Sequence, residues 1–185
     1  MMWDLPTSVE LNGKTLKIRN NCDFRVVLDV IAALNDEDLP EKNRIVCALV
    51  IFYENHNDIE DMTAATVEMF KIINNGEIED PNSPEKPRLI DWSHDFKQMA
   101  PPISRVLGYD IRTPEKYTHW YTFLGGYTEM GGDCTFASIV GIRQKKQKGK
   151  KLDKWEIDFL RENRQMVELP QKLTAEEEEW LNSEW

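Results

Sequence analysis

The sequence predicts a mainly α protein, a single compact helical domain of about seven to eight helices with a small N-terminal β-hairpin. Apolar residues recur at spacings of three and four over most of the chain, and strict alternation occurs only before residue 20. The connections between the early helical stretches are short, which favours antiparallel neighbours. With 185 residues, 41% of them hydrophobic and 30% charged, the chain is long enough to bury a hydrophobic core without the help of disulfide bonds or metal ions.

Composition divides the chain into five segments. These are a hairpin arm (1–20), a first helical subregion (21–76), a Pro-rich linker loop (77–88), a second helical subregion (89–167) and an acidic C-terminal helix (168–185). The linker holds three prolines among charged and polar residues, so we expect an exposed, mobile loop between the two helical subregions.

The hairpin is predicted by Asn12-Gly13, the preferred dipeptide of a two-residue turn. Val9 and Leu11 alternate with polar residues before the turn, and Leu16 and Ile18 alternate after it. Because a lone hairpin is marginally stable, it must pack on the helices or pair with another chain.

Three amphipathic stretches follow, and a helix-start residue precedes each: Asn21 or Asp23, then Pro40, then Asn57 or Asp58. The uninterrupted apolar run 45–53 predicts that the second helix is buried on most sides. Asn74-Asn75-Gly76 is typical of a helix end.

Beyond the linker, residues 89–99 predict a short helix that Pro101-Pro102 breaks. A second short turn runs from Ile103 to Leu107, and Gly108 closes it.

An aromatic helix is predicted next, with Thr113 as its N-cap and Pro114 as its first residue. Gly131-Gly132 ends it. Its apolar surface is made by aromatic residues and a leucine at helical spacing: Tyr117, Trp120, Tyr121, Phe123, Leu124 and Tyr127. Such a stripe usually lies in a core, but aromatics also anchor interfaces, so Trp120, Phe123 and Tyr127 are candidate partner-binding residues.

A second apolar helix (136–142) leads into a basic segment (143–151), and a third helix follows with Asp153 as its cap and Trp155 on its apolar side. The basic segment is interpreted as a solvated loop or as an electrostatic contact for an acidic partner. Its candidate partner-binding residues are Arg143, Lys145, Lys146, Lys148, Lys150 and Lys151.

The last eighteen residues hold six glutamates and one lysine. They could pair with the basic segment within one molecule or between copies. Thr174 and Glu177 predict a capping box, and Trp180 and Trp185 are candidates for a subunit contact because a short acidic helix buries tryptophans poorly.

No catalytic pattern stands out, so we predict no enzymatic activity, no cofactor and no metal site. His94 with Asp91 and Asp95 is the nearest approach to a metal ligand set, and Cys134 with His119 the nearest to a nucleophile and base. The simpler interpretation makes His119 a solvent-edge residue and Cys134 a buried small residue.

The net charge of −10 argues against bulk nucleic-acid binding. No apolar run reaches the length of a membrane span, and the first residues do not form a signal peptide. The three separated cysteines are expected to be buried free thiols in a reducing compartment, so a cytoplasmic location is expected.

The second half of the chain carries packing residues in an order that resembles a family of bacteriophage tail proteins. The matching pieces are Tyr109-Asp110-Ile111, Trp120 with Phe123-Leu124, Phe136 with Ile139, Ile142-Arg143, Lys145-Lys146, Lys151-Leu152, Lys154, Glu156, Phe159 and Asn163. The resemblance extends over about residues 9–164 and leaves the acidic tail outside it. Members of that family are encoded beside the tape-measure gene in long-tailed phages of Gram-positive hosts.

The resemblance implies a tail assembly chaperone in the host cytoplasm. Its partners would be the tape-measure protein and the tail-tube subunits, with self-association and no membrane. A structural tail component retained in the virion is one alternative, and a small nucleic-acid-binding regulator that uses the basic segment is another.

Overall fold

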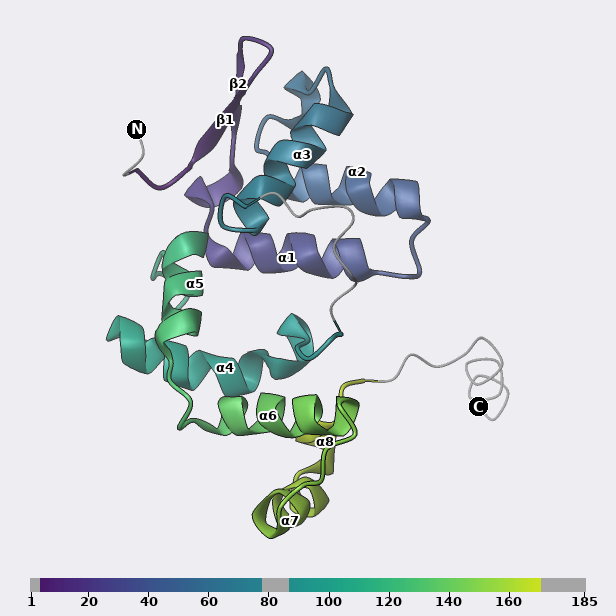
Figure 1. Ribbon diagram of the computed structural model, residues 1–185. Helices are drawn as coiled ribbons and strands as arrows, with labels where there is room; N and C mark the ends of the chain where they lie inside the picture. Colours follow the sequence, from purple (N-terminus) through teal and green to yellow (C-terminus); the bar gives the residue numbers. More distant parts are fainter. Residues whose placement is uncertain (1–3, 78–86, 171–185) are drawn as a thin grey trace, which may run out of the picture. The chain divides into compact units, whose positions relative to one another are not determined.

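Eight α-helices and one antiparallel hairpin make up residues 4–77 and 87–170, which are the residues that this computed structural model describes (Figure 1). The mainly α class with an N-terminal hairpin is confirmed. The helices are α1 (Phe24–Asn35), α2 (Glu41–Phe52), α3 (Met62–Ile73), α4 (Trp92–Leu107), α5 (Trp120–Glu129), α6 (Thr135–Gln147), α7 (Lys154–Glu162) and α8 (Arg164–Val167). The predicted capping box of Thr174 and Glu177 lies outside the described residues, as do Trp180, Trp185 and most of the Pro-rich linker.

The described residues form two units by their contacts. The first unit contains residues 4–77 and 97–131, and the second contains residues 87–96 and 132–170. Helix α4 contributes its first turn to the second unit and its remaining turns to the first.

The hairpin pairs β1 (Ser8–Leu11) with β2 (Lys14–Lys17), and Val9 lies directly opposite Leu16. Asn12 and Gly13 both have positive φ, of 52° and 77°, as the predicted two-residue turn requires. Val9 and Leu16 are buried. The hairpin is held by the segment after α2, where Ile18 pairs with Tyr53, so the expectation that it packs on the rest of the chain is confirmed.

Helices α1, α2 and α3 form the body of the first unit, with α1 alongside α2 and α3 against α2 (Figure 1). Asp23 caps α1 by accepting a hydrogen bond from the amide of Arg25, which confirms one of its two predicted caps. Arg19 donates to the carbonyls of Ile51 and Val50 at the end of α2, where carbonyl groups lack intrahelical partners.

Helix α3 begins later than predicted. Asn57 and Asp58 belong to a 3₁₀ turn (His56–Asp58), and Asp61 caps the helix by accepting from the amide of Ala64. Its predicted end at Asn74-Asn75-Gly76 is confirmed, because Gly76 takes the left-handed conformation with φ of 87°.

Helix α4 runs through Pro101 and Pro102, so the predicted break there is wrong. A proline in a helix interior removes a hydrogen bond and costs about 3 kcal/mol. The residues around the two prolines offset that cost by packing, since Met99, Ala100 and Ile103 are fully buried.

Helix α5 begins at Trp120 and not at Pro114, which corrects the predicted start of the aromatic helix. The guanidinium of Arg25 in α1 donates to the carbonyls of Ile111 and Thr113, which fixes this stretch in an irregular path. His119 is extended, pairs with Asp23, and caps α5 through its own side chain.

In the second unit, α6 packs against α8, and α8 packs against α7. A small core is formed by Ile139, Ile142 and Val167, with Phe159 and Leu160 packed against it. Asp153 caps α7 in a full capping box with Glu156, as predicted for Asp153. The basic segment is not all loop, because α6 continues to Gln147 and includes Arg143, Lys145 and Lys146.

Candidate functional site

The aromatic face of α5 is core. Trp120 is 1% exposed and donates its indole N–H to the carbonyl of Ile73 at 2.9 Å. Phe123 is fully buried and stacks on Phe24, with ring centroids 4.7 Å apart. Trp120 and Phe123 therefore stabilise the first unit and offer no surface to a partner. Tyr127, the third candidate on this helix, is half-buried.

His119 is 1% exposed, which corrects its interpretation as a solvent-edge residue. Its Nδ1 accepts from the amide of Tyr121 at 3.0 Å, so its Nε2 carries the proton and donates to the carbonyl of Pro6 at 3.0 Å. Burial lowers the pKa of His119. Burial also raises the pKa of the Cys22 thiol to about 12, so this thiol stays protonated at neutral pH.

Helices α2 and α3 each present a row of large apolar side chains to solvent. On α2, Val46 and Val50 are 43% and 39% exposed, one turn apart and opposite the buried Ala48, Leu49 and Phe52. This corrects the expectation that α2 is buried on most sides.

On α3, the side chains of Val67 and Phe70 are 46% and 39% exposed, opposite the buried Ala65, Met69 and Ile72. Since α2 and α3 pack against each other, both rows lie on one helix pair. We name these four side chains the α2–α3 apolar face.

Arg143 is buried, with 7% of the residue exposed, so it is not part of a solvated segment as predicted. Its guanidinium binds the carboxylate of Asp95 through two hydrogen bonds of 2.6 and 2.8 Å. Its other N–H groups donate to the carbonyls of Val167, Leu89 and Met166, so all five donors are used. Arg143 therefore joins α4, α6 and α8, and its guanidinium is fully used in contacts within the second unit.

Two of the predicted lysines are also engaged within the second unit. Lys145 binds Glu156 at 2.5 Å, and that hydrogen bond raises the pKa of Lys145. Lys146 lies 3.4 Å from a carboxylate oxygen of Glu168. In contrast, Lys148, Lys150 and Lys151 are exposed and form no ion pair within residues 4–77 and 87–170.

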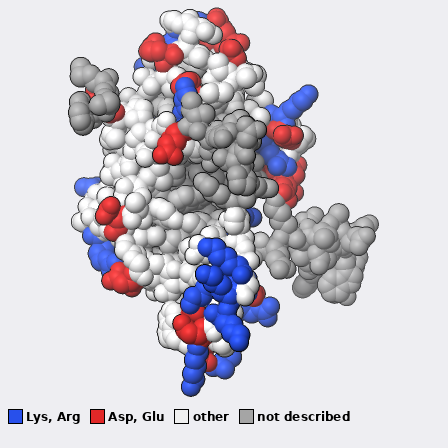
Figure 2. Space-filling view, in the orientation of Figure 1, with Lys and Arg blue, Asp and Glu red and all other residues white. Residues whose placement is uncertain are grey.

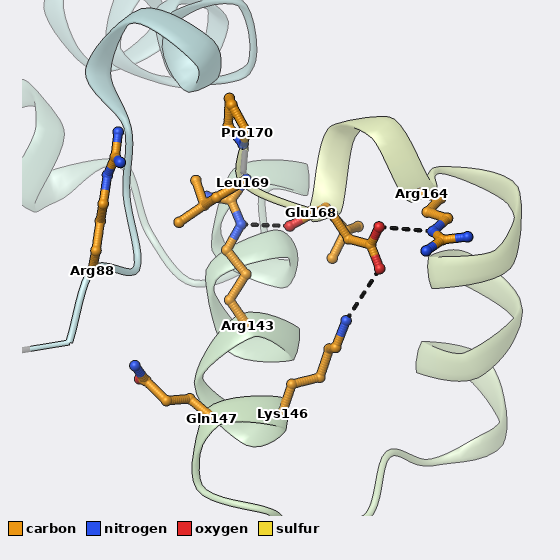
Figure 3. A pocket seen from close by; sticks show the side chains of 9 residues that line it. Arg88, Arg143, Lys146, Gln147, Arg164, Glu168, Leu169 and Pro170 are labelled. Atoms are coloured by element: carbon orange, nitrogen blue, oxygen red, sulfur yellow. Dashed lines mark hydrogen bonds and ion pairs between the residues drawn. The ribbon is translucent and has the colours of Figure 1, made fainter. Parts of the chain in front are cut away.

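A pocket of about 690 Å³ opens beside these ion pairs in the second unit (Figure 3). Lys146 from α6 and Arg164 from α8 approach the carboxylate of Glu168 from two sides, with Arg164 at 2.7 Å. The hydrogen bond from Arg164 is the main cause that lowers the pKa of Glu168. Glu168 therefore lines the pocket as the partner of two of its cationic side chains, Lys146 and Arg164.

The residues named as candidates for chemistry make contacts within the chain. Asp95 is held by Arg143, and the amide of His94 donates to Asp91, which also pairs with Arg88. Cys134 is half-buried and its sulfur caps α6. Cys47 is half-buried as well, so of the three thiols expected to be buried only Cys22 is.

Within residues 4–77 and 87–170, no group of three or more metal-ligating side chains gathers. No helix in the same residues is both long enough and apolar enough to cross a bilayer.

The comparison with protein families matches residues 2–169 to the model of the bacteriophage Gp15 protein. The chain belongs to the bacteriophage Gp15 protein family. The phage origin that the sequence resemblance implied is therefore confirmed. No curated protein and no solved structure matches the chain. The match ends at residue 169, so residues 170–185 lie beyond the part of the chain that the family model covers.

Sequence reasoning missed the α2–α3 apolar face and the role of Arg143 in this Gp15 protein. The run 45–53 is apolar without interruption, so nothing in it marks Val46 and Val50 as the outward side. A local signal did exist for Arg143, because it stands four residues after the buried Ile139 and so on the same face of α6.

Proposed function

We propose that this Gp15 protein is a tail assembly chaperone that binds the tape-measure protein through the α2–α3 apolar face. The observation that carries the proposal is this face, where four large apolar side chains between 39% and 46% exposed lie on two packed helices. Membership of a phage protein family and the resemblance to proteins encoded beside the tape-measure gene support the same role.

The physical basis of this proposal is that a tape-measure protein is prone to aggregate before it is enclosed. A long helical chain with apolar stripes aggregates if the stripes meet water before the tail tube encloses them. A helix pair with outward valine and phenylalanine side chains can cover such a stripe, as in helix-in-groove recognition. Many weakly bound copies along one rod provide avidity and can still be displaced by tube subunits.

In this proposal the protein acts in the host cytoplasm, where tails assemble, and uses no cofactor. No bond is made or broken. Self-association and contact with tail-tube subunits remain predictions of the same role.

Co-expression with the tape-measure protein of the same phage tests the proposal. We expect the tape-measure protein to move from the pellet to the soluble fraction when this chain is present, and to co-purify with it. If the tape-measure protein stays equally insoluble with and without the chain, the proposal is wrong.

A structural tail subunit is the second candidate, because the same apolar face would equally serve a permanent subunit contact. Mass spectrometry of purified virions distinguishes the two. A chaperone is absent from finished particles, whereas a structural subunit is present in a fixed ratio to the tube protein.

A further inference from the structure

The loop between α6 and α7 and the start of α7 carry four exposed lysines: Lys148, Lys150, Lys151 and Lys154. None of them forms an ion pair with another described residue, unlike the neighbouring Lys145 and Lys146. Figure 2 shows Lys and Arg side chains gathered at the bottom of the view, where Figure 1 places α7. The exposed Asp153 lies between Lys151 and Lys154, and the surface keeps a net positive charge.

Trp155 lies directly after these lysines and is 56% exposed. It stacks on Phe159 of its own helix, with ring centroids 5.4 Å apart. An exposed tryptophan beside four exposed lysines suits a partner that is acidic and aromatic. We name Trp155 and the four lysines the α7 basic face.

The chain itself contains a segment of that chemistry. Residues 171–185 hold five glutamates, of which Glu176–Glu179 are consecutive, together with Trp180, Trp185 and a single lysine. The four exposed lysines and the exposed Asp153 between them carry a net charge of +3, and the segment carries −4, so the two are opposite in charge and both contain tryptophan.

The route of the chain brings this segment within reach. The described residues end at Pro170, which lines the same pocket as Lys146 and Glu168 in the second unit. Fifteen residues can span at most roughly 50 Å, and a tether of about this length gives an effective concentration on the order of millimolar. Glu168 already forms an ion pair with Lys146 of α6, which is the type of contact that the glutamates of residues 171–185 would form with other lysines.

We propose that the acidic segment 171–185 binds in cis to the α7 basic face, with its glutamates on the four lysines and a tryptophan against Trp155. This proposal is independent of the α2–α3 apolar face, which belongs to the first unit.

The full-length protein labelled with fluorotryptophan tests it by ¹⁹F NMR, with Trp155 assigned from a Trp155→Phe variant. We expect the Trp155 resonance to shift, and its broadening by a soluble gadolinium complex to increase, when Glu176, Glu177, Glu178 and Glu179 are all changed to Gln. Lys148→Gln, Lys150→Gln, Lys151→Gln and Lys154→Gln together should produce the same increase. High salt should do so too, because screening shortens the Debye length to about 3 Å at 1 M.

A matched control changes Glu115 and Glu129, two exposed glutamates of the first unit, to Gln and should leave Trp155 unaffected. The buried Trp120 reports the fold in every sample. If the glutamate variant gives the wild-type Trp155 signal, the proposal is overturned. If the wild-type protection of Trp155 disappears on dilution, a second copy supplies the segment and binding in cis is overturned.

Discussion

The carboxylate of Asp95 and the guanidinium of Arg143 form a buried, two-bond ion pair between residues 48 apart in the chain. Asp95 is 1% exposed, and its Oδ2 also accepts from the amide of Asp91. The three other N–H groups of Arg143 donate to backbone carbonyls. Every N–H group of the guanidinium therefore has an acceptor, and three carbonyls of the neighbouring segments have a donor. It is the polar centre of the second unit.

Substitutions that break this ion pair should lower the free energy of unfolding of the second unit. Asp95→Asn leaves a buried charge without its counter-charge, and we expect the free energy of unfolding to fall by about 3–5 kcal/mol. Arg143→Lys should also destabilise, because one ammonium group cannot serve five acceptors in fixed directions. Hydrogen exchange of the α6 amides measures both effects.

The exposed pair of Arg161 and Asp158 is the control for these substitutions. Arg161→Lys should change stability by less than about 0.5 kcal/mol. Equal effects of Arg161→Lys and Asp95→Asn would contradict the assignment of a structural role to Arg143.

Alanine substitutions at two adjacent glycines of α5 should change the stability of the first unit in opposite directions. A Cβ on Gly126 would lie 2.9 Å from Cγ2 of Ile103, which is fully buried and cannot move aside. We expect Gly126→Ala to destabilise the first unit by about 1–3 kcal/mol. Gly125 has no atom within 4 Å of such a Cβ, so Gly125→Ala should stabilise by up to about 1 kcal/mol. Urea unfolding compares the two, and an unchanged or higher stability of Gly126→Ala would contradict the close approach of α4 and α5.

The stability of the first unit should fall as the pH drops below about 6.5, the ordinary pKa of histidine. Burial lowers the pKa of His119 in the folded chain, so the unfolded chain takes up the proton first as the pH drops. The proton would have to enter at Nδ1, which accepts the capping hydrogen bond from Tyr121.

His119→Asn tests this, since asparagine caps a helix without titrating. Urea unfolding between about pH 5 and pH 7.5 should show a smaller loss of stability for the variant than for the wild type. An equal loss in both proteins would mean that His119 is not the group responsible.

Trp120→Ala should cost about 3–5 kcal/mol, because the indole fills the core against Phe123 and holds the carbonyl of Ile73. Thermal unfolding measures the loss. A variant that keeps the wild-type midpoint but fails in assembly would show instead that Trp120 meets a partner.

Local signals in the sequence predicted local structure well. Asp23 and Asp153 cap helices, and Asn12-Gly13 forms the turn, because each hydrogen bond or dihedral angle involves residues a few positions apart. The start of α5 could not be predicted in this way. Thr113-Pro114 is a good local start signal, but Arg25 from α1 holds the carbonyl of Thr113.

The candidate site was predicted less well for a related reason. Exposure depends on which side of a helix meets a neighbour, and the spacing of Val46 and Val50 is also that of a buried face. Trp155 was expected on an apolar side, yet α7 buries Glu156 in its place, in contact with Lys145. Tertiary contacts decided both cases.

The most direct test of the proposed function is the amount of soluble tape-measure protein after co-expression with a variant of the α2–α3 apolar face. Val50→Lys with Phe70→Lys alters two exposed positions and should leave the fold intact, as circular dichroism can verify. The matched control places lysine at Val106, which is 42% exposed on α4. The proposal predicts that the wild type and the control keep the tape-measure protein soluble and that the double variant does not. Equal solubility with the folded double variant would contradict it.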